Sequence, residues 1–575
     1  MADRGSDARR DRWTFAVAAV PFLLLAWWFW FLCDDAYITF RYARNLARGH
    51  GIRYNLGDQP SEGYSNFLWM LLSALSEAIG VPAGNTVNLV SAACGLCALW
   101  LFVRIAREHL GTSVTATGAA ALALACFPPF DVWATSGLET MSFTLLILLT
   151  FERVVLARGE WGVTAGLAAL GLALTRTEGV LWAGVIFGIG AIVRWRERPP
   201  AARPSDLARP FGVAALILLV PYTAYSGFRL WWFGTLVSNT TLVKAHFGVA
   251  SIVRGAKYLL MFQATFVAWL PLLLGAIPAI RRSRWAGLAV ALMALGFPLY
   301  GVLVGGDFMP MGRMFVAGAP FLYLLLAAAL DPLARSHRRS GQVAAGAIAA
   351  LVAALGVLPG VFDIHVVPQP MREALHFRTT DRAFLTEYGR WENMDENTTG
   401  FIIRGTAIRD HAAPGDTLVG QAIGAVGYIS DLYIYDCYGL VTREVAELPV
   451  PEGVAWDHSP GHDKEVAAEY FVKDDPTYLH MRVVQGAKAA ILMKDSFERW
   501  EVAEEVMDRY VPAYLEVEIP GEKKRSFLLM VRKALPGEDP AEMWTSFEAS
   551  RVALHRELKA DPLANGGEPA TSAEP

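Results

Sequence analysis

Long apolar runs, separated by short polar or basic loops, fill the chain as far as about Val361. A run of about 20 apolar residues is the length that spans a bilayer as a helix. Of the 575 residues, 54% are hydrophobic and only 18% are charged, a balance outside the range of soluble globular domains. The sequence therefore predicts an α-helical polytopic membrane protein, followed by a soluble region.

Arginine positions predict the orientation of these helices. Arginines between residues 4 and 12 precede the first apolar run, so the positive-inside rule places the N-terminus in the cytoplasm and Asp34 outside. Taking the later basic loops as cytoplasmic gives about eleven transmembrane helices. The short apolar stretch at 67–81 is then a helix at the membrane surface, because a crossing there would place the later basic loops outside.

The resulting topology divides the chain into three expected parts. Residues 1–361 form a transmembrane catalytic domain, with a first outside loop at about 34–80. Residues 362–559 form a soluble extracytoplasmic domain that is expected to bind the acceptor. Residues 560–575, rich in Pro, Ala, Glu and Gly, form a disordered tail.

The expected soluble domain has the pattern of a small α/β or α+β fold. Two or three short β-runs separated by glycines occur at 413–441, and another occurs at 525–533. Helical stretches such as 372–388 lie between or before them.

Charge and cysteine content exclude some functions. A net charge of −4 gives no general affinity for nucleic acid. Four of the five cysteines lie in or beside apolar runs, so no disulfide framework is expected. Cys94 and Cys97 form a CxxC pair inside an apolar helix without a second ligand pair, which favours two small core residues over a zinc or redox site.

Two adjacent carboxylates, Asp34 and Asp35, follow directly after the first apolar run. An isolated charge is costly to bury in hydrocarbon, so the pair is expected at the rim of the membrane. Two adjacent carboxylates also raise each other's pKa, so such a pair is expected to have either a cationic partner or a functional role. The aromatic and arginine residues that follow have the spacing of a helix in the interface plane. This rim is predicted to be an active site facing away from the cytoplasm.

Other polar residues that look too specific for ordinary loops fall on the same outer face. Each has a structural alternative: Arg176 and Glu178 could form an interface ion pair, and Arg313 could snorkel at a helix end. Their gathering on one face favours a common site. They are Glu62, Tyr64, Asn66, Glu139, Arg176, Glu178, Asn239, Lys244, His246, Asp307, Arg313, Asp436 and the run His458–Glu465.

Glycosyl transfer would use these residue types. A carboxylate near an acceptor hydroxyl can take its proton as the sugar carbon develops oxocarbenium character. Cations must stabilise the leaving group, and Lys244, His246, Arg176 and Arg313 are available on the same face. The chain has no Gly-rich phosphate loop after a strand, and nucleotide sugars belong to the cytoplasm. The expected donor is therefore a lipid-phosphate sugar that reaches the site from within the bilayer.

Eight motifs, in order between about Asp34 and His462, carry a family resemblance. They are DDAYITFRYARNLARGHGIRYN, EGYSNFLW, TSGLET, TRTEG, FGTLVSNTTLVKA, GGDFMPMGRMF, DCYGLVTREVA and PGHDKE. With the carboxylate pair after the first span, they resemble the GT-C superfamily of membrane glycosyltransferases. More narrowly, they resemble the terminal arabinofuranosyltransferases of mycobacterial cell walls.

The resemblance implies a polyprenyl-phosphate arabinofuranose donor and a glycan acceptor, at the outer face of a bacterial plasma membrane. It implies that Asp34 is the leading catalytic carboxylate and that Asp35 orients a substrate hydroxyl. Lys244, Arg176 and Arg313, with His246, would hold the donor phosphate. The expected donor-sugar residues are Glu139, Glu178, Asn239 and Asp307, and the expected acceptor residues are Glu62, Tyr64, Asn66, Trp456, His458 and His462.

Several alternatives stay open. A related transferase could modify lipopolysaccharide, pilin or flagellin instead. A transporter or flippase for lipid-linked sugars would show two halves with matching broken segments, and a receptor or scaffold would only bind glycan. Asp34 and Asp35 could supply oxygen ligands to a divalent cation, although no further carboxylate cluster of fixed spacing completes a shell, so no cofactor is firmly predicted. Inversion or retention at the sugar carbon is also open.

Overall fold

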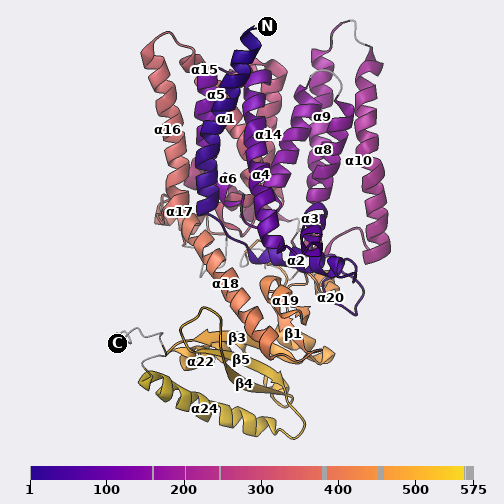
Figure 1. Cartoon of the computed structure of the whole chain (residues 1–575), viewed down its shortest axis with the longest axis vertical. Helices are drawn as coiled ribbons and strands as arrows, with labels where there is room; N and C mark the ends of the chain where they lie inside the picture. Colours follow the sequence, from indigo (N-terminus) through magenta and orange to yellow (C-terminus); the bar gives the residue numbers. More distant parts are fainter. Residues whose placement is uncertain are drawn as a thin grey trace.

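The computed structural model describes residues 2–157, 161–200, 203–244, 248–377, 385–450, 459–460, 462–561 and 564. The first part of the chain forms a bundle of helices, and the last part forms a region with a β-sheet at one end of that bundle (Figure 1). The N-terminus lies at the opposite end of the bundle. The last long apolar helix ends at Val361.

Six helical segments among the described residues are long and apolar enough to cross a membrane. The pair α12 (Val249–Phe266) and α13 (Trp269–Arg282) passes the same test together but is bent by 86°, so length and composition support six or seven spans. The eleven expected spans remain a prediction, because several apolar runs form helices of only 12 or 14 residues. The six segments are Ala83–His109, Gly179–Glu197, Pro204–Phe233, Arg284–Leu303, Pro310–Ala334 and Arg339–Val361.

The bundle is built almost entirely from helices, several of them joined end to end. In chain order it consists of α1 (Ala2–Trp28), α2 (Asp34–Ala47), α3 (Phe67–Ala78), α4 (Ala83–Arg104), η1 (Ile105–His109), α5 (Val114–Ala125), α6 (Pro128–Val132), α7 (Thr140–Phe151), η2 (Glu152–Leu156), α8 (Gly162–Thr175), α9 (Gly179–Glu197), α10 (Pro204–Phe233), α11 (Asn239–Lys244), α12, α13, α14 (Arg284–Leu303), η3 (Pro310–Gly318), α15 (Ala319–Ala334) and α16 (Arg339–Val361).

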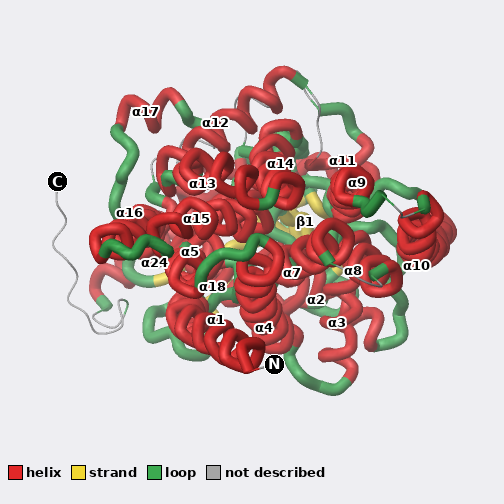
Figure 2. The backbone as a smooth tube through the Cα atoms, turned by 90° about the horizontal axis from the view of Figure 1, so that it is seen from above, coloured by secondary structure: helices red, strands yellow, loops and turns green. Residues whose placement is uncertain are grey.

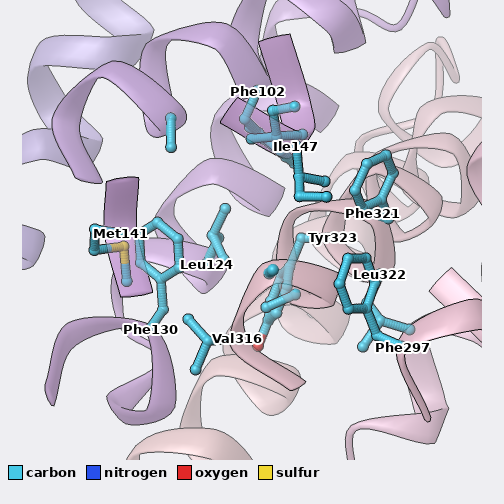
Figure 3. Close-up of a cluster of buried hydrophobic side chains, with 14 of the residues drawn as sticks. Phe102, Leu124, Phe130, Met141, Ile147, Phe297, Val316, Phe321, Leu322 and Tyr323 are labelled. Carbon is cyan, nitrogen blue, oxygen red and sulfur yellow. The ribbon is translucent and has the colours of Figure 1, made fainter. Parts of the chain in front are cut away.

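The core of the bundle surrounds α15. In the span that contains α15, 89% of the most apolar window is buried, whereas the corresponding figure for α10 is 11%. A helix that is apolar on every side must be covered by other helices or by lipid. Accordingly α15 packs against α13 and α5, and α10 and α16 lie at the rim (Figure 2). Figure 3 shows aromatic side chains such as Phe321 and Tyr323 interleaved with Phe102, Phe130 and Phe297 in this core.

The helix α2 lies between the bundle and the sheet-containing region (Figure 1). It begins at Asp34, directly after Cys33 in extended conformation, and carries two acids in its first turn and Arg44 in its last. Both charge types complement the helix dipole. It packs against α3 on one side and against the C-terminal region on another, so nine of its residues are buried. The first loop thus places its carboxylates at the junction of the two parts.

The C-terminal region contains one five-stranded sheet with strand order β2-β1-β3-β5-β4. β1 pairs in parallel with β2 and β3, while β3, β5 and β4 are antiparallel neighbours. Helices cover its faces. The elements are α17 (Gln369–Ala374), α18 (Glu387–His411), β1 (Thr417–Gly420), α19 (Gly424–Ser430), β2 (Tyr433–Asp436), α20 (Arg443–Glu447), η5 (Ala468–Asp474), β3 (Tyr478–Gln485), α22 (Ala489–Trp500), α23 (Glu504–Met507), β4 (Tyr510–Val517), β5 (Ser526–Lys533) and α24 (Pro540–Ala560).

One local prediction in this region is confirmed and one was wrong. Of the two or three β-runs expected within 413–441, two form, as β1 and β2, and the segment 424–430 between them is the helix α19, which two glycines allow to pack closely on α2. The helix expected over 372–388 is interrupted: α17 ends at Ala374 and α18 begins at Glu387, and residues 378–384 lie outside the described part of the chain. Most of the expected tail at 560–575 also lies outside the described residues.

Candidate active site

The two carboxylates of the first loop have different partners. Asp34 accepts hydrogen bonds from the backbone N–H groups of Ala425 (2.7 Å) and Gly424 (3.2 Å), at the start of α19. Asp35 instead faces Lys244, and the Lys244 Nζ lies 3.5 Å from the Asp35 Oδ2. The side chain of Asp35 is 28% exposed. Burial raises the pKa of Asp34 to about 6, although the N–H of Ala425 opposes the rise. Asp35 is therefore the carboxylate that remains available to a substrate.

The helix α2 also holds the other end of α19. Arg41, which is buried, donates to the carbonyl oxygens of Gly427 (2.8 Å) and Leu432 (2.6 Å). A carboxylate at the N-terminus and a guanidinium at the C-terminus of α19 both complement its dipole. The fit is close: a methyl group added at Gly424 would lie 2.0 Å from the backbone oxygen of Asp34. The C-terminal region is thus fixed to the helix that carries Asp35.

A second ion pair lies beside Asp35 and Lys244. Arg313 Nε lies 2.8 Å from Asp307 Oδ2; the Asp307 side chain is buried and that of Arg313 is 12% exposed. Burial favours the neutral acid, but Arg313 and Lys244 together hold the pKa of Asp307 below its ordinary value. Arg313 follows a turn in which Met311 and Gly312 have φ of 56° and 58°, and the N–H of Met311 donates to Glu387 of α18 (2.6 Å). The turn presents Arg313 to the site.

Arg176 is held by two carboxylates that were expected to bind sugar. Its Nε donates to Glu178 Oε1 at 2.6 Å and its Nη1 donates to Glu139 Oε1 at 2.5 Å. Glu139 in turn accepts from Asn66 (2.8 Å), and Asn66 accepts from Thr39 of α2 (3.1 Å). This continuous chain of side chains fixes the position of Arg176 relative to α2.

A cavity lies beside these cations, between α7, α9, α14 and η3. Four of its ten lining residues are aromatic, and Trp182 stacks on Phe297 with ring centroids 4.0 Å apart. Arg176 and Arg313 both line it. Guanidinium groups match phosphate oxygens, and an aromatic wall suits hydrocarbon. The cavity therefore has the chemistry to hold a lipid phosphate.

The expected acceptor residues do not form one surface. Glu62 is buried and is bound by Arg229 (Nε to Oε2, 2.9 Å) and Tyr225 of α10, so it anchors the first loop to the bundle. Tyr64 and Asn66 are also buried, inside the wall of the site. These three side chains support the site rather than present themselves to a glycan.

His462 does lie at the site. Its ring packs edge-on against Phe308 (4.6 Å between centroids) and Tyr438 (5.3 Å). Burial and the charge of Lys244 lower the pKa of His462. Asn239, at the start of α11, donates to the carbonyl of Gly439 (3.3 Å), so this loop of the C-terminal region closes one side of the site. The predictions for His246, Trp456 and His458 lie outside the described residues.

A buried ion pair that the sequence did not predict locks the loop of His462. Both oxygens of Asp463 accept from Arg254 of α12, at 2.6 and 2.8 Å, and the two side chains are 0% and 5% exposed. Asp463 belongs to the PGHDKE motif, but its partner lies 209 residues earlier without a local signal. The pair ties the C-terminal region to the bundle.

Asp463→Ala should destabilise the protein strongly, because it removes the carboxylate that binds the buried Arg254 guanidinium through two hydrogen bonds. We expect the free energy of unfolding to fall by about 3–5 kcal/mol, seen as a lower Tm in detergent. Asp410→Ala is a matched control, since Asp410 pairs with Arg409 at the surface, where the side chains are 44% and 53% exposed. Equal effects of the two substitutions would contradict this role.

Among the described residues, no group of three or more His, Cys, Asp or Glu side chains is placed to hold a metal ion. Both carboxylate oxygens of Asp34 already accept backbone N–H groups. The chemistry proposed below uses no metal ion.

The fold is similar to that of the solved structure of ArnT. The crystal structure of ArnT from Cupriavidus metallidurans bound to undecaprenyl phosphate superposes with a TM-score of 0.53 at 15% identity, over 90% of this chain and 97% of that one. Residues 392–525 match a family described as "Domain of unknown function (DUF8728)".

The chain also resembles two terminal β-(1→2)-arabinofuranosyltransferases. It is 27% identical to that of Corynebacterium glutamicum over 359 residues (56% of this chain, 51% of the relative) and 27% identical to that of Mycobacterium tuberculosis over 285 residues (45% and 42%). The matches thus span about half, or less, of the length of these curated relatives. The resemblance inferred from the motifs, to a GT-C arabinofuranosyltransferase, is confirmed.

Proposed function

We propose that the protein is a membrane glycosyltransferase that moves a pentofuranose from a polyprenyl-phosphate donor to a cell-envelope glycan at the outer face of the plasma membrane. The proposed pentofuranose is arabinofuranose. The observation that carries the proposal is the meeting of Asp35, Lys244, Arg313 and Arg176 beside an aromatic-walled cavity. The names of the two sequence relatives support the sugar, and the lipid bound to ArnT supports a polyprenyl-phosphate donor.

In the proposed reaction Asp35 is the general base. Its carboxylate takes the proton of the acceptor hydroxyl while that oxygen forms a bond to the anomeric carbon of the sugar. The bond between this carbon and the phosphate oxygen breaks, and the lipid phosphate leaves with the electron pair. Lys244, Arg313 and Arg176 stabilise its negative charge. Asp34 is assigned to the docking of α19 rather than to proton transfer, because both of its oxygens are engaged there.

The expected sugar-binding residues take two roles in this proposal. Asp307 lies beside Lys244 and Arg313, and Asn239 begins α11, the helix that ends at Lys244, so both can contact the furanose. Glu139 and Glu178 orient Arg176 through their ion pairs. His462 is the described candidate for contact with the acceptor.

The sidedness is part of the proposal. The N-terminus and the sheet-containing region lie at opposite ends of the bundle, which requires an odd number of crossings, as eleven is (Figure 1). With the arginines in the first turns of α1 in the cytoplasm, α2 and residues 362–559 face outward. Residues 1–361 then form the catalytic domain, and residues 362–559 hold the acceptor.

The test is an assay of the purified chain in lipid nanodiscs with synthetic polyprenyl-phosphate sugars. We expect turnover with the arabinofuranose lipid and an arabinan fragment. Turnover with hexose or aminosugar lipids alone, or only with lipopolysaccharide, pilin or flagellin acceptors, would keep the enzyme class and reject the arabinan assignment. Movement of the lipid across the bilayer without transfer would identify a flippase. The described residues contain one bent helix pair rather than the matching broken segments of a transporter, which favours transfer.

Arg176→Lys should weaken donor binding more than it slows chemistry. Lysine keeps the charge, but its single ammonium group cannot bind Glu139, Glu178 and the donor phosphate together, as the several N–H groups of a planar guanidinium can. We expect the KM for the donor to rise about tenfold with a smaller change in kcat. Arg153→Lys, which alters an arginine paired with Glu152 in η2, is the matched control and should leave both constants unchanged. A loss confined to kcat would contradict a phosphate-binding role.

A further inference from the structure

A second cavity lies between α12, the end of α16, α17 and the first turn of α18. It shares no lining residue with the cavity at Arg176 and Arg313. One wall is apolar and includes Met261, Pro359 and Phe377, and the other carries Arg372 and Arg390. A hollow with one apolar and one cationic wall suits an amphiphile with an anionic head.

The position of this cavity along α16 places it at the surface of the bilayer. α16 exposes apolar side chains along its length, and further exposed apolar side chains follow between its end and α17. Figure 1 shows α17 at the lower end of α16. An exposed apolar segment that directly follows a spanning helix is typical of chain that lies among lipid head groups. The exposed side chains beyond the helix are Phe362, Ile364, Val366 and Met371.

The ionisable groups that line the cavity favour an anion. They are two arginines, two histidines and one carboxylate, namely Arg372, Arg390, His365, His376 and Glu387. The single carboxylate already accepts the N–H of Met311. Arg372 Nη1 lies 3.0 Å from His365 Nε2, and its buried Nε has no hydrogen-bond partner among the described residues. A guanidinium group with an unused donor is suited to a phosphate oxygen.

We propose that this cavity binds the phosphate head group of a lipid, with the hydrocarbon chain against α12 and α16. Two sources share this chemistry: an anionic phospholipid of the bilayer and a polyprenyl phosphate. One hydrogen bond links the cavity to the proposed donor site. Glu387 lines the cavity and accepts the N–H of Met311, in the turn that presents Arg313. A bound phosphate lipid therefore steadies that turn, and only this effect on transfer rests on the proposed function.

Native mass spectrometry of the detergent-purified full chain tests the binding without any transfer reaction. Phosphatidylglycerol, undecaprenyl phosphate and diacylglycerol are offered separately. We expect the wild-type chain to retain one of the two phosphate lipids but not diacylglycerol, and the preferred lipid identifies the source. Retention should fall as the NaCl concentration rises. Equal retention of diacylglycerol, or retention that does not depend on salt, would overturn the proposal.

Substitutions locate the site. Arg372→Glu should lower retention at least about tenfold, while Arg372→Lys should keep part of it. Arg338→Glu, at the opposite end of α16, is the matched control and should change nothing. Retention unaffected by Arg372→Glu, or lowered as much by Arg338→Glu, rejects this cavity. In nanodiscs, adding the retained lipid should raise the transfer rate of the wild type and not of Arg372→Glu. An absence of transfer in both would reject the proposed function and leave the binding result standing.

Discussion

Asp35→Asn is expected to reduce sugar transfer at least about a hundredfold. Asparagine keeps the size of the side chain but cannot take the proton of the acceptor hydroxyl. Asp35 faces Lys244 and is partly exposed, so the loss should appear in kcat and not in the folding of the chain. The measurement is the rate of transfer from a synthetic polyprenyl-phosphate arabinofuranose, with Tm recorded in parallel.

Asp34→Asn is the matched comparison, one residue away in the same helical turn. Its amide oxygen can still accept a hydrogen bond from Ala425 or Gly424, and Asp34 is not assigned to proton transfer. We expect a smaller loss of activity and a lower Tm. Normal turnover in both variants would remove the catalytic assignment of the pair. A loss of activity confined to Asp34→Asn would instead identify Asp34 as the general base and leave Asp35 without that role.

Gly424→Ala should separate the C-terminal region from α2. The added methyl group would lie 2.0 Å from the backbone oxygen of Asp34, which cannot move aside as a side chain can. α19 must then shift, and a misplacement of about 1 Å near a catalytic group can lower the rate about a hundredfold. We expect such a loss of transfer, together with faster cleavage of the C-terminal region by trypsin.

Gly400→Ala provides the control for this substitution. Gly400 lies in α18 with open space around it, so alanine there should be neutral or should stabilise the helix by up to about 1 kcal/mol. Unchanged activity and protease resistance in Gly424→Ala would show that α19 does not need its close contact with α2.

Much of the helical fold could be predicted because apolar run length and arginine position are local signals. The same local reasoning gave two or three β-runs within 413–441 but did not predict the helix between them at 424–430. There the tertiary contact decides the structure, since Gly424 and Gly427 permit a helix to lie against Asp34 and Tyr54. The bend between α12 and α13 was not predicted either, because composition alone does not show where a span breaks.

The candidate site could be predicted as a set of residues but not as a set of roles. Asp34 and Asp35 stand out by their position after the first apolar run. Their different partners could not be predicted, because the backbone groups that bind Asp34 lie about 390 residues later. Glu62 and Asn66 were expected to face the acceptor, yet they are bound inside the wall by Arg229 and Glu139. Burial of this kind follows from packing, which a motif does not reveal.

The attachment of α19 to α2 has a consequence for engineering acceptor choice. A chimera that replaces the C-terminal region after Val361 would remove the N–H groups that bind Asp34 and the carbonyl groups that bind Arg41. A chimera designed to exchange acceptor specificity should therefore keep residues 424–432 of the recipient. The helical bundle then retains the segment that binds its own α2, while the rest of the C-terminal region is exchanged.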